Sequence, residues 1–177
     1  MTCILVVGLS RSGKDAVANY ITQRHDFQKF DFNDVVVEEL RRRRLQVTKP
    51  NLESVRAELL KAEGQASIAR TVMKKTPRNE RIILVGLRSL PEMKEVRLVF
   101  PDVIVVRVDS DEEKRFGRKD RSENISREQF YDRDENDLYD GGLSRVFDSA
   151  DYVLDNNSGI APLYGKIEEF LSKKGLD

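Results

Sequence analysis

The sequence predicts an α/β protein whose parallel sheet carries helices on both faces. Short apolar runs, each the length of a buried strand, alternate with segments whose apolar residues recur at helical spacing. The expected strands are residues 3–7, 27–32, 81–85, 103–108 and 152–154. Because such alternation is typical of parallel sheets, ligands are expected beyond the carboxyl ends of the strands.

The loop after the first strand carries the most specific motif. Residues 8–14 read G-L-S-R-S-G-K, a Walker A type phosphate loop between a strand and a helix. Its glycines allow backbone N–H groups to turn inward around an anion, and the helix adds the positive end of its dipole. A chance match on a glycine turn is the alternative. The predicted nucleotide-binding residues are Gly8, Ser10, Arg11, Ser12, Gly13, Lys14 and Asp15.

Asp15 departs from the usual motif. Serine or threonine normally follows the lysine and places a hydroxyl on Mg²⁺. A carboxylate can also bind Mg²⁺, directly or through water. The sequence therefore predicts Asp15 as the metal residue, with a plain helix-capping role as the alternative.

Composition limits the class of protein. The chain has 177 residues, 39% of them apolar and 35% charged, with 31 basic and 31 acidic side chains. A zero net charge gives no general argument for nucleic-acid or membrane partners. One cysteine excludes a disulfide framework within the chain. Residues 3–7 are too short for a signal-peptide core, and no run approaches a membrane span, so we expect a cytoplasmic protein.

Helices are expected to begin at residue 15 and to span residues 34–45, 52–63, 65–75, 91–100, 111–119, 127–137 and 162–173, with Asn51 as an N-cap. We expect a single domain, residues 1–177, that has three parts. The core comprises residues 1–33, 80–113 and 146–177, a substrate-side helical insertion comprises about 34–79, and a lid comprises about 114–145.

Two charged segments have alternative interpretations. Arg41–Arg44 could be a nucleic-acid patch, but acidic residues precede it and no aromatic residues are interleaved, so nucleic acid is an unexpected partner. Residues 114–145 are dense in arginine, as suits a mobile lid that excludes water and neutralises a transferring phosphoryl group. An ordinary salt-bridged surface is the alternative for this segment.

Several short motifs, taken in order, resemble one family. They are the loop G-L-S-R-S-G-K, Phe32–Val36, Gly64 with Ile68-Ala69, Gly86–Ser89, Arg133-Asp134 and Ala150–Tyr152. Together they are similar to the archaeal adenylate-kinase-related, dephospho-CoA-kinase-like P-loop proteins. The resemblance covers nearly the whole chain. It implies the P-loop NTPase fold with a five-stranded sheet, an arginine lid, and ATP and Mg²⁺ as ligands.

Three positions depart from the resemblance. Asp15 replaces serine or threonine, and Val37 stands where relatives often carry arginine. Val85 stands where relatives have an aspartate at the end of the third strand, near Mg²⁺. The last change puts catalysis in question unless Asp15 or Asp34 holds the metal.

The leading hypothesis is a kinase that moves the γ-phosphoryl group of ATP to a small molecule. The resemblance suggests a nucleoside monophosphate or a dephospho-CoA-like acceptor. The residues predicted to act in transfer are Lys14, Asp34, Arg88, Arg118, Arg121 and Arg133. Lys14 would hold the donor, Asp34 would orient the acceptor, and the arginines would neutralise charge. The alternative is a nucleotide-binding switch or partner-binding protein with little transfer.

Overall fold

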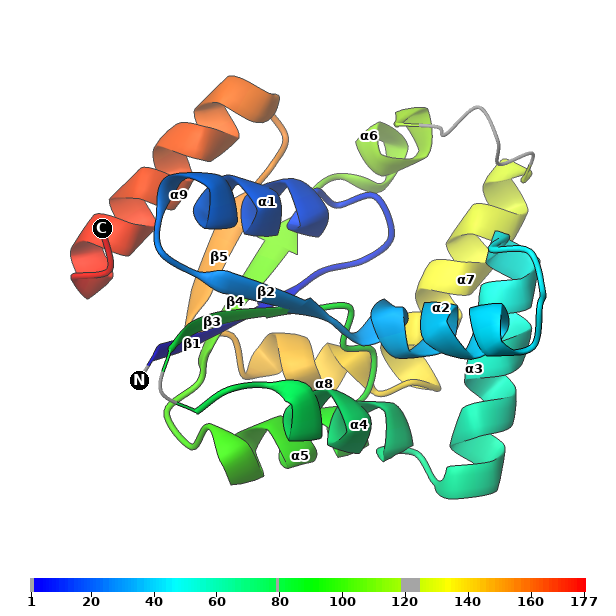
Figure 1. Cartoon of the computed structure of the whole chain (residues 1–177). Coiled ribbons are helices and arrows are strands. Elements are labelled where there is room, and N and C mark those ends of the chain that lie inside the picture. The colour runs from blue at the N-terminus through cyan, green and yellow to red at the C-terminus, as the bar shows by residue number, and fades with distance from the viewer. Residues whose placement is uncertain (1, 79, 119–124) are drawn as a thin grey trace.

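The sheet is parallel throughout and has its phosphate loop at the centre. The computed structural model in Figure 1 describes residues 2–78, 80–118 and 125–177. Its five strands run in the order β2-β3-β1-β4-β5. They are β1 (Thr2–Val7), β2 (Gln28–Asp31), β3 (Arg81–Val85), β4 (Ile104–Asp109) and β5 (Tyr152–Asp155). Since β1 lies between β3 and β4, the loop after β1 leaves the sheet where the connections diverge to both sides.

Helices cover both faces of this sheet, as the sequence predicts. They are α1 (Lys14–Arg24), α2 (Phe32–Arg42), α3 (Lys49–Glu63), α4 (Ser67–Lys75), α5 (Leu90–Val99), α6 (Glu112–Gly117), α7 (Arg127–Tyr139), α8 (Leu143–Asp148) and α9 (Ile160–Lys174). In Figure 1, α1 and α9 lie on one face, and α4, α5 and α8 lie on the other. Helices α3 and α7 lie beyond the carboxyl ends of the strands.

The alternating side chains of β1 build two cores. Ile4 and Val6 pack with residues of α1 and α9. Cys3, Leu5 and Val7 face the opposite way and pack with residues of α2, α4, α5 and α8. Because both faces of β1 are buried, its register is fixed by packing, and the loop that follows it has a rigid support.

Helix α2 begins earlier than the sequence predicts. The expected second strand extended to Phe32, but the carboxylate of Asp31 caps a helix there by accepting a hydrogen bond from the Asn33 N–H at 2.8 Å. Phe32 is fully buried as the first helical residue. Asp34 therefore lies in the first turn of α2, and not at the end of a strand.

The prediction of Asn51 as a helix N-cap is wrong. Helix α3 starts at Lys49, and the cap is Thr48, whose hydroxyl accepts from the Asn51 N–H at 3.4 Å. The sequence analysis began this helix at residue 52, after Pro50. Proline is tolerated in the first turn of a helix, however, because the N–H it lacks has no partner there.

Helix α8 was not expected. The sequence indicated only a turn at residues 140–142 before the last strand. Leu143, Val146 and Phe147 are all buried, and their spacing places them on one face of a short helix. A helix of six residues is too short for its periodicity to stand out in the sequence.

Candidate active site

The loop between β1 and α1 needs glycine at both ends. A Cβ atom on Gly8 would lie 2.8 Å from the Val108 carbonyl oxygen. Gly13 has a φ of 106°, and a Cβ there would lie 2.3 Å from Nδ2 of Asn156. Helix α1 starts directly after Gly13, with the Val17 N–H bonded to the Gly13 carbonyl at 3.0 Å. The backbone therefore turns tightly into a helix N-terminus, which is the geometry of an anion site.

Lys14 lies at the mouth of this loop and is mostly buried. Its side chain is 21% exposed, and its Nζ atom lies 4.0 Å from Oδ2 of Asp15. Burial lowers the pKa of Lys14 from its ordinary value, although Asp15 opposes the change. A cation that has lost much of its water gains most from an anionic ligand, so the position suits a phosphate group.

Asp15 is in the first turn of α1 and remains open to solvent. Its side chain is 62% exposed, and it lies 4.0 Å from the Nζ atoms of both Lys14 and Lys29. Its oxygens are therefore accessible beside the phosphate loop. The metal-binding role of Asp15 stays a prediction.

Arg118 holds the loop from its outer side. Its guanidinium donates to the carbonyl oxygens of Arg11 at 2.9 Å, Ser12 at 3.2 Å and Asn156 at 2.6 Å. Asn156 also donates from its side chain to the Ser12 carbonyl at 2.7 Å. These contacts hold the carbonyl oxygens of Arg11 and Ser12 in place, so the backbone of the loop is fixed on this side.

A second arginine, which the sequence analysis did not single out as a site residue, ties α6 and α7 to the loop. Arg115 donates to the carbonyl oxygens of Ser10 at 3.2 Å and Ser110 at 3.0 Å. It also pairs with Asp134 at 2.5 Å, and both side chains are 5% exposed. Burial raises the pKa of Asp134, while Arg115 opposes the change. Only the tertiary structure identifies this buried pair among the many charges of the segment.

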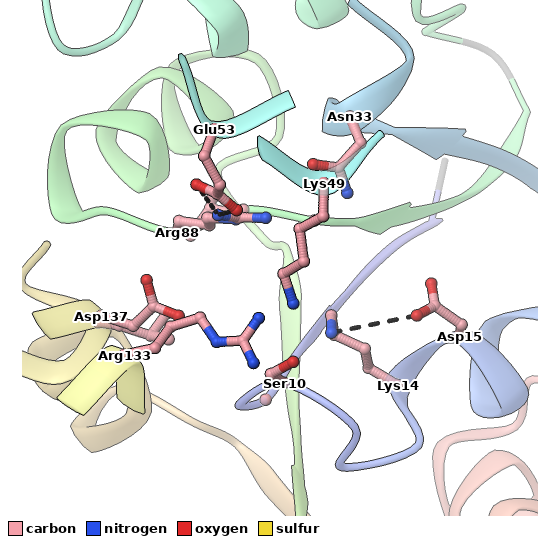
Figure 2. A pocket seen from close by; sticks show the side chains of 13 residues that line it. Ser10, Lys14, Asp15, Asn33, Lys49, Glu53, Arg88, Arg133 and Asp137 are labelled. Atoms are coloured by element: carbon pink, nitrogen blue, oxygen red, sulfur yellow. Dashed lines mark hydrogen bonds and ion pairs between the residues drawn. The ribbon is translucent and has the colours of Figure 1, made fainter. Parts of the chain in front are cut away.

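Two adjoining cavities open beside the loop. The inner cavity, drawn in Figure 2, is lined by charged side chains at Lys14, Asp15, Lys49, Glu53, Arg88, Arg133 and Asp137. The outer cavity, of about 930 Å³, is lined by charged side chains at Arg11, Lys14, Asp15, Lys49, Glu53, Arg118 and Arg133. Basic groups outnumber acidic ones in both, by four to three and by five to two.

Besides Lys14, three segments far apart in the sequence supply cations to the inner cavity. They are the start of α3, the loop after β3 and helix α7. Lys49 points in from the start of α3, and Arg133 reaches in from α7 (Figure 2). Burial, together with the neighbouring Arg11, lowers the pKa of Arg133. Lys49 was missed by the sequence analysis, which read it as part of a break between helices.

Arg88 follows β3 and is held in place by two acidic residues. Its guanidinium contacts both carboxylate oxygens of Glu53, at 2.9 and 3.1 Å. Its backbone N–H donates to Glu92 at 2.7 Å. Burial alone would lower the pKa of Arg88, but Glu53 raises it above the ordinary value.

The structure brings together most of the predicted site residues. Gly8, Ser10, Lys14, Asp15, Arg88 and Arg133 line the inner cavity, and Arg11 and Arg118 line the outer one. Asp34 is exposed and lies outside both linings, because α2 begins at Phe32 and turns it away. Asn33 lines the inner cavity instead. Arg121 lies outside the described residues.

Asp31 occupies the place where the missing acid at Val85 is needed. The two residues are partners in the parallel pairing of β2 with β3. A Cβ on Gly86, which lines the inner cavity, would lie 2.5 Å from Oδ1 of Asp31. Burial, and then the neighbouring Asp15, raise the pKa of Asp31, while the Asn33 N–H lowers it. The adjacent strand thus supplies a carboxylate at this edge of the sheet.

The described residues contain no group of three or more histidine, cysteine or acidic side chains arranged to hold a metal ion. Mg²⁺ at nucleotide sites usually needs only one or two carboxylates, with phosphate oxygens and water as the other ligands. Two carboxylates lie at this edge of the sheet, Asp15 beside the phosphate loop and Asp31 at the end of β2.

The described part of residues 114–145 makes both buried contacts and surface ion pairs. Phe130 of α7 is fully buried, and Arg11 of the loop lies 4.9 Å from its ring centre. On the outer surface, Arg127 pairs with Glu113 in an ordinary salt bridge. The described part of the segment is therefore packed against the loop, and its movement stays a prediction.

Two solved structures with a similar fold are shikimate kinases. A shikimate kinase from Acinetobacter baumannii, in complex with shikimate, matches with a TM-score of 0.62 and 18% identity over 100% of this chain and 96% of its own. A shikimate kinase from Bacteroides thetaiotaomicron matches with a TM-score of 0.63 and 12% identity over 97% and 98%. Together with the sheet order and the loop, these likenesses define a P-loop NTPase fold.

Sequence relatives identify the family. No family model matches the chain. A UPF0200 protein from Thermococcus sibiricus is 31% identical over 98% of this chain and 95% of its own length. A second, from Thermococcus onnurineus, is 30% identical over 96% of each chain. The chain belongs to the UPF0200 family. The narrower likeness to adenylate kinase or dephospho-CoA kinase is not shown by these relatives.

No helix among the described residues is both long and apolar enough to cross a membrane.

Proposed function

We propose that this protein is a kinase that transfers the γ-phosphoryl group of ATP to a small molecule. The observation that carries the proposal is the convergence of Lys14, Lys49, Arg88 and Arg133 on one cavity beside the phosphate loop. Phosphoryl transfer requires little covalent chemistry from the protein. It depends on positioning and on cations around the transferring group, which this cavity supplies.

The residues divide the work by position. The loop N–H groups and Lys14 bind the β- and γ-phosphates, and Arg118 and Asn156 keep the loop in its binding geometry. Lys49 and Arg133 face Lys14 across the inner cavity and balance the charge that develops during transfer (Figure 2). An incoming oxygen of the acceptor would bond to the γ-phosphorus as the bond to the β-phosphate oxygen breaks and ADP leaves.

Mg²⁺ is the metal this donor set would take. Asp15 and Asp31 would hold it, and bound there it would neutralise phosphate charge. Asp31 makes the valine at position 85 compatible with catalysis, because its carboxylate stands next to that position on the paired strand.

The proposed acceptor follows from the sequence resemblance and from the cations of the inner cavity. The resemblance suggests a nucleoside monophosphate or a dephospho-CoA-like compound, whose phosphate would meet Lys49, Arg88 or Arg133. The rival function, a nucleotide-binding switch without transfer, is favoured by the replacement of an acidic residue by Val85, which is fully buried and has no polar group.

Replacing Lys14 tests the nucleotide site directly. Lys14→Ala should weaken ATP binding about a hundredfold, which is the loss of one charge-assisted contact of roughly 3 kcal/mol. Calorimetric titration of ATP measures the change. Lys61→Ala, an exposed lysine of α3 outside both cavities, is the matched control. Equal affinities in the two variants would mean that the loop is not a nucleotide site.

A further inference from the structure

A third cavity lies on the far side of the Arg88–Glu53 pair. This side cavity, of about 500 Å³, lies between α3, the start of α5 and the end of α7. It shares Glu53, Arg88 and Asp137 with the inner cavity, so the two spaces meet at these residues. Its volume falls in the range of ~300–1,000 Å³ that is usual for small-molecule sites.

The balance of charge reverses in this side cavity. Its charged lining residues are Glu53, Arg56, Arg88, Asp137 and Asp140, so acidic groups outnumber basic ones by three to two. Both arginines already have carboxylate partners, since Arg88 contacts Glu53 at 2.9 Å and Arg56 contacts Glu92 at 2.6 Å. A phosphate or carboxylate entering this space would face repulsion from three carboxylates and find no uncompensated cation.

Arg56 carries a buried hydrogen-bond donor that has no partner among the described residues. Its side chain is 7% exposed, and Nη2 donates to Glu92. Its Nη1 atom is buried and has no hydrogen-bond partner among the described residues. Leaving such a donor unsatisfied costs about 1–3 kcal/mol, so its persistence beside a cavity suits a site where a ligand oxygen completes the bond.

The remaining lining groups fit hydroxyl groups. Arg56 is a donor, the amides of Gln65 and Asn136 are both donors and acceptors, and Asp137 and Asp140 are acceptors when ionised. A hydroxyl group donates and accepts, so it matches every one of these partners, whereas a phosphate dianion can only accept. Ala57, Leu60 and Pro91 supply apolar surface for a carbon skeleton.

We infer that the side cavity binds the body of a neutral, polyhydroxylated acceptor, a polyol or a sugar-like compound, and presents one of its hydroxyl groups to the phosphate loop. This inference rests on the proposed kinase function and names its substrate class. It differs from the nucleoside monophosphate that the sequence resemblance suggests.

Asp137 lines the inner cavity (Figure 2) and also the side cavity, so it stands where the accepting hydroxyl group would pass from one to the other. In the transfer, the hydroxyl oxygen bonds to the γ-phosphorus, the bond from that phosphorus to the ADP oxygen breaks, and the hydroxyl proton moves to the Asp137 carboxylate. Burial raises the pKa of Asp137, with Arg88 opposing the change, which makes its carboxylate a better proton acceptor.

The experiment compares two sets of acceptors. ADP release with ATP and Mg²⁺ is measured for erythritol, ribose, glucose and myo-inositol, and for AMP, CMP and dephospho-CoA. Saturation-transfer NMR with bound ADP measures the affinity for each compound. At least one neutral polyol should bind and accept phosphate, and the monophosphates should do neither at the same concentration.

Two variants place the acceptor in the side cavity. Asp140→Asn should weaken polyol binding about tenfold and leave ATP affinity within twofold, because Asp140 lines the side cavity and neither the inner nor the outer cavity. Asp137→Asn should reduce turnover more than affinity. Asp132→Asn, an exposed residue of α7 outside all three cavities, is the matched control and should change neither.

Three results would overturn the inference. The first is a preference for monophosphates as acceptors. The second is that no polyol binds or accepts phosphate although the protein still binds ATP. The third is that Asp140→Asn and the wild type bind the polyol with equal affinity. The proposed function would survive all three. A wild-type protein that fails to bind ATP would overturn the proposed function itself.

Discussion

The outer cavity and the side cavity share Glu53 but differ in the sign of the charge that predominates in their linings. Five basic and two acidic side chains line the outer cavity, against two basic and three acidic in the side cavity. A nucleotide triphosphate carries several negative charges, so the outer cavity suits it. The reversal within one cleft teaches that the phosphates and the acceptor are expected in different electrostatic environments.

The arginines of the two regions also differ in their partners. Near the loop, the acceptors of Arg118 among the described residues are three backbone carbonyls, at 2.6 to 3.2 Å, so Arg118 fixes the backbone. In the side region, Arg56 and Arg88 contact the carboxylates of Glu92 and Glu53. We therefore expect substitutions near the loop to affect nucleotide binding, and substitutions in the side region to affect stability or acceptor binding.

The largest expected effect is on stability in the side region. Arg56→Met leaves the carboxylate of Glu92, which is 1% exposed, without its cation. Breaking one side of a buried pair costs about 3–5 kcal/mol of unfolding free energy. Urea denaturation of the purified protein measures the loss.

The control for this prediction is an exposed pair. Arg70 contacts Glu95 at 3.3 Å, with side chains 45% and 25% exposed. Arg70→Met should cost less than about 1 kcal/mol. Similar losses of unfolding free energy in the two variants would show that the buried Arg56–Glu92 pair stabilises the protein no more than the exposed pair does.

A smaller effect is expected on nucleotide affinity near the loop. Arg118→Met removes two hydrogen bonds to loop carbonyls, those of Arg11 and Ser12, and a third to the Asn156 carbonyl, and it should weaken ATP binding about tenfold. The free energy of unfolding should change little, because Arg118 is only partly buried. Calorimetry and urea denaturation separate the two quantities.

Arg127→Met provides the comparison for Arg118→Met, since Arg127 is an arginine of the same segment that pairs with Glu113 on the surface. It should leave ATP affinity unchanged. If the two variants behave alike, the contacts of Arg118 with the loop do not support nucleotide binding.

The smallest expected effect concerns the metal. Asp15→Asn keeps the shape of the side chain but removes its charge, so Mg²⁺ should no longer strengthen ATP binding, a change of several-fold. Titrations of ATP with and without Mg²⁺ measure it in Asp15→Asn and in Asp26→Asn, an exposed aspartate just after α1. Equal Mg²⁺ enhancement in Asp15→Asn and the wild type would remove Asp15 from the metal site.

The sequence predicted the architecture because its signals are local. The apolar runs of all five strands and the glycine loop are each contained within a few residues. Errors occurred where a boundary depended on capping. Asp31 and Thr48 cap helices that the sequence analysis began later, and these shifts moved Asp34 out of the site and brought Lys49 into it.

The sequence by itself determined that a phosphate loop follows a buried strand, because that motif fixes its own backbone through Gly8, Gly13 and the helix that begins at Lys14. Only the tertiary structure decided which of the 31 basic side chains meet at that loop. Arg88, Arg118 and Arg133 come from segments separated by loops and helices, and burial and pairing decide where each guanidinium points. The sequence shows which residues are charged. Which charged residues pair depends on the packing of distant segments, and no short window of sequence contains that information.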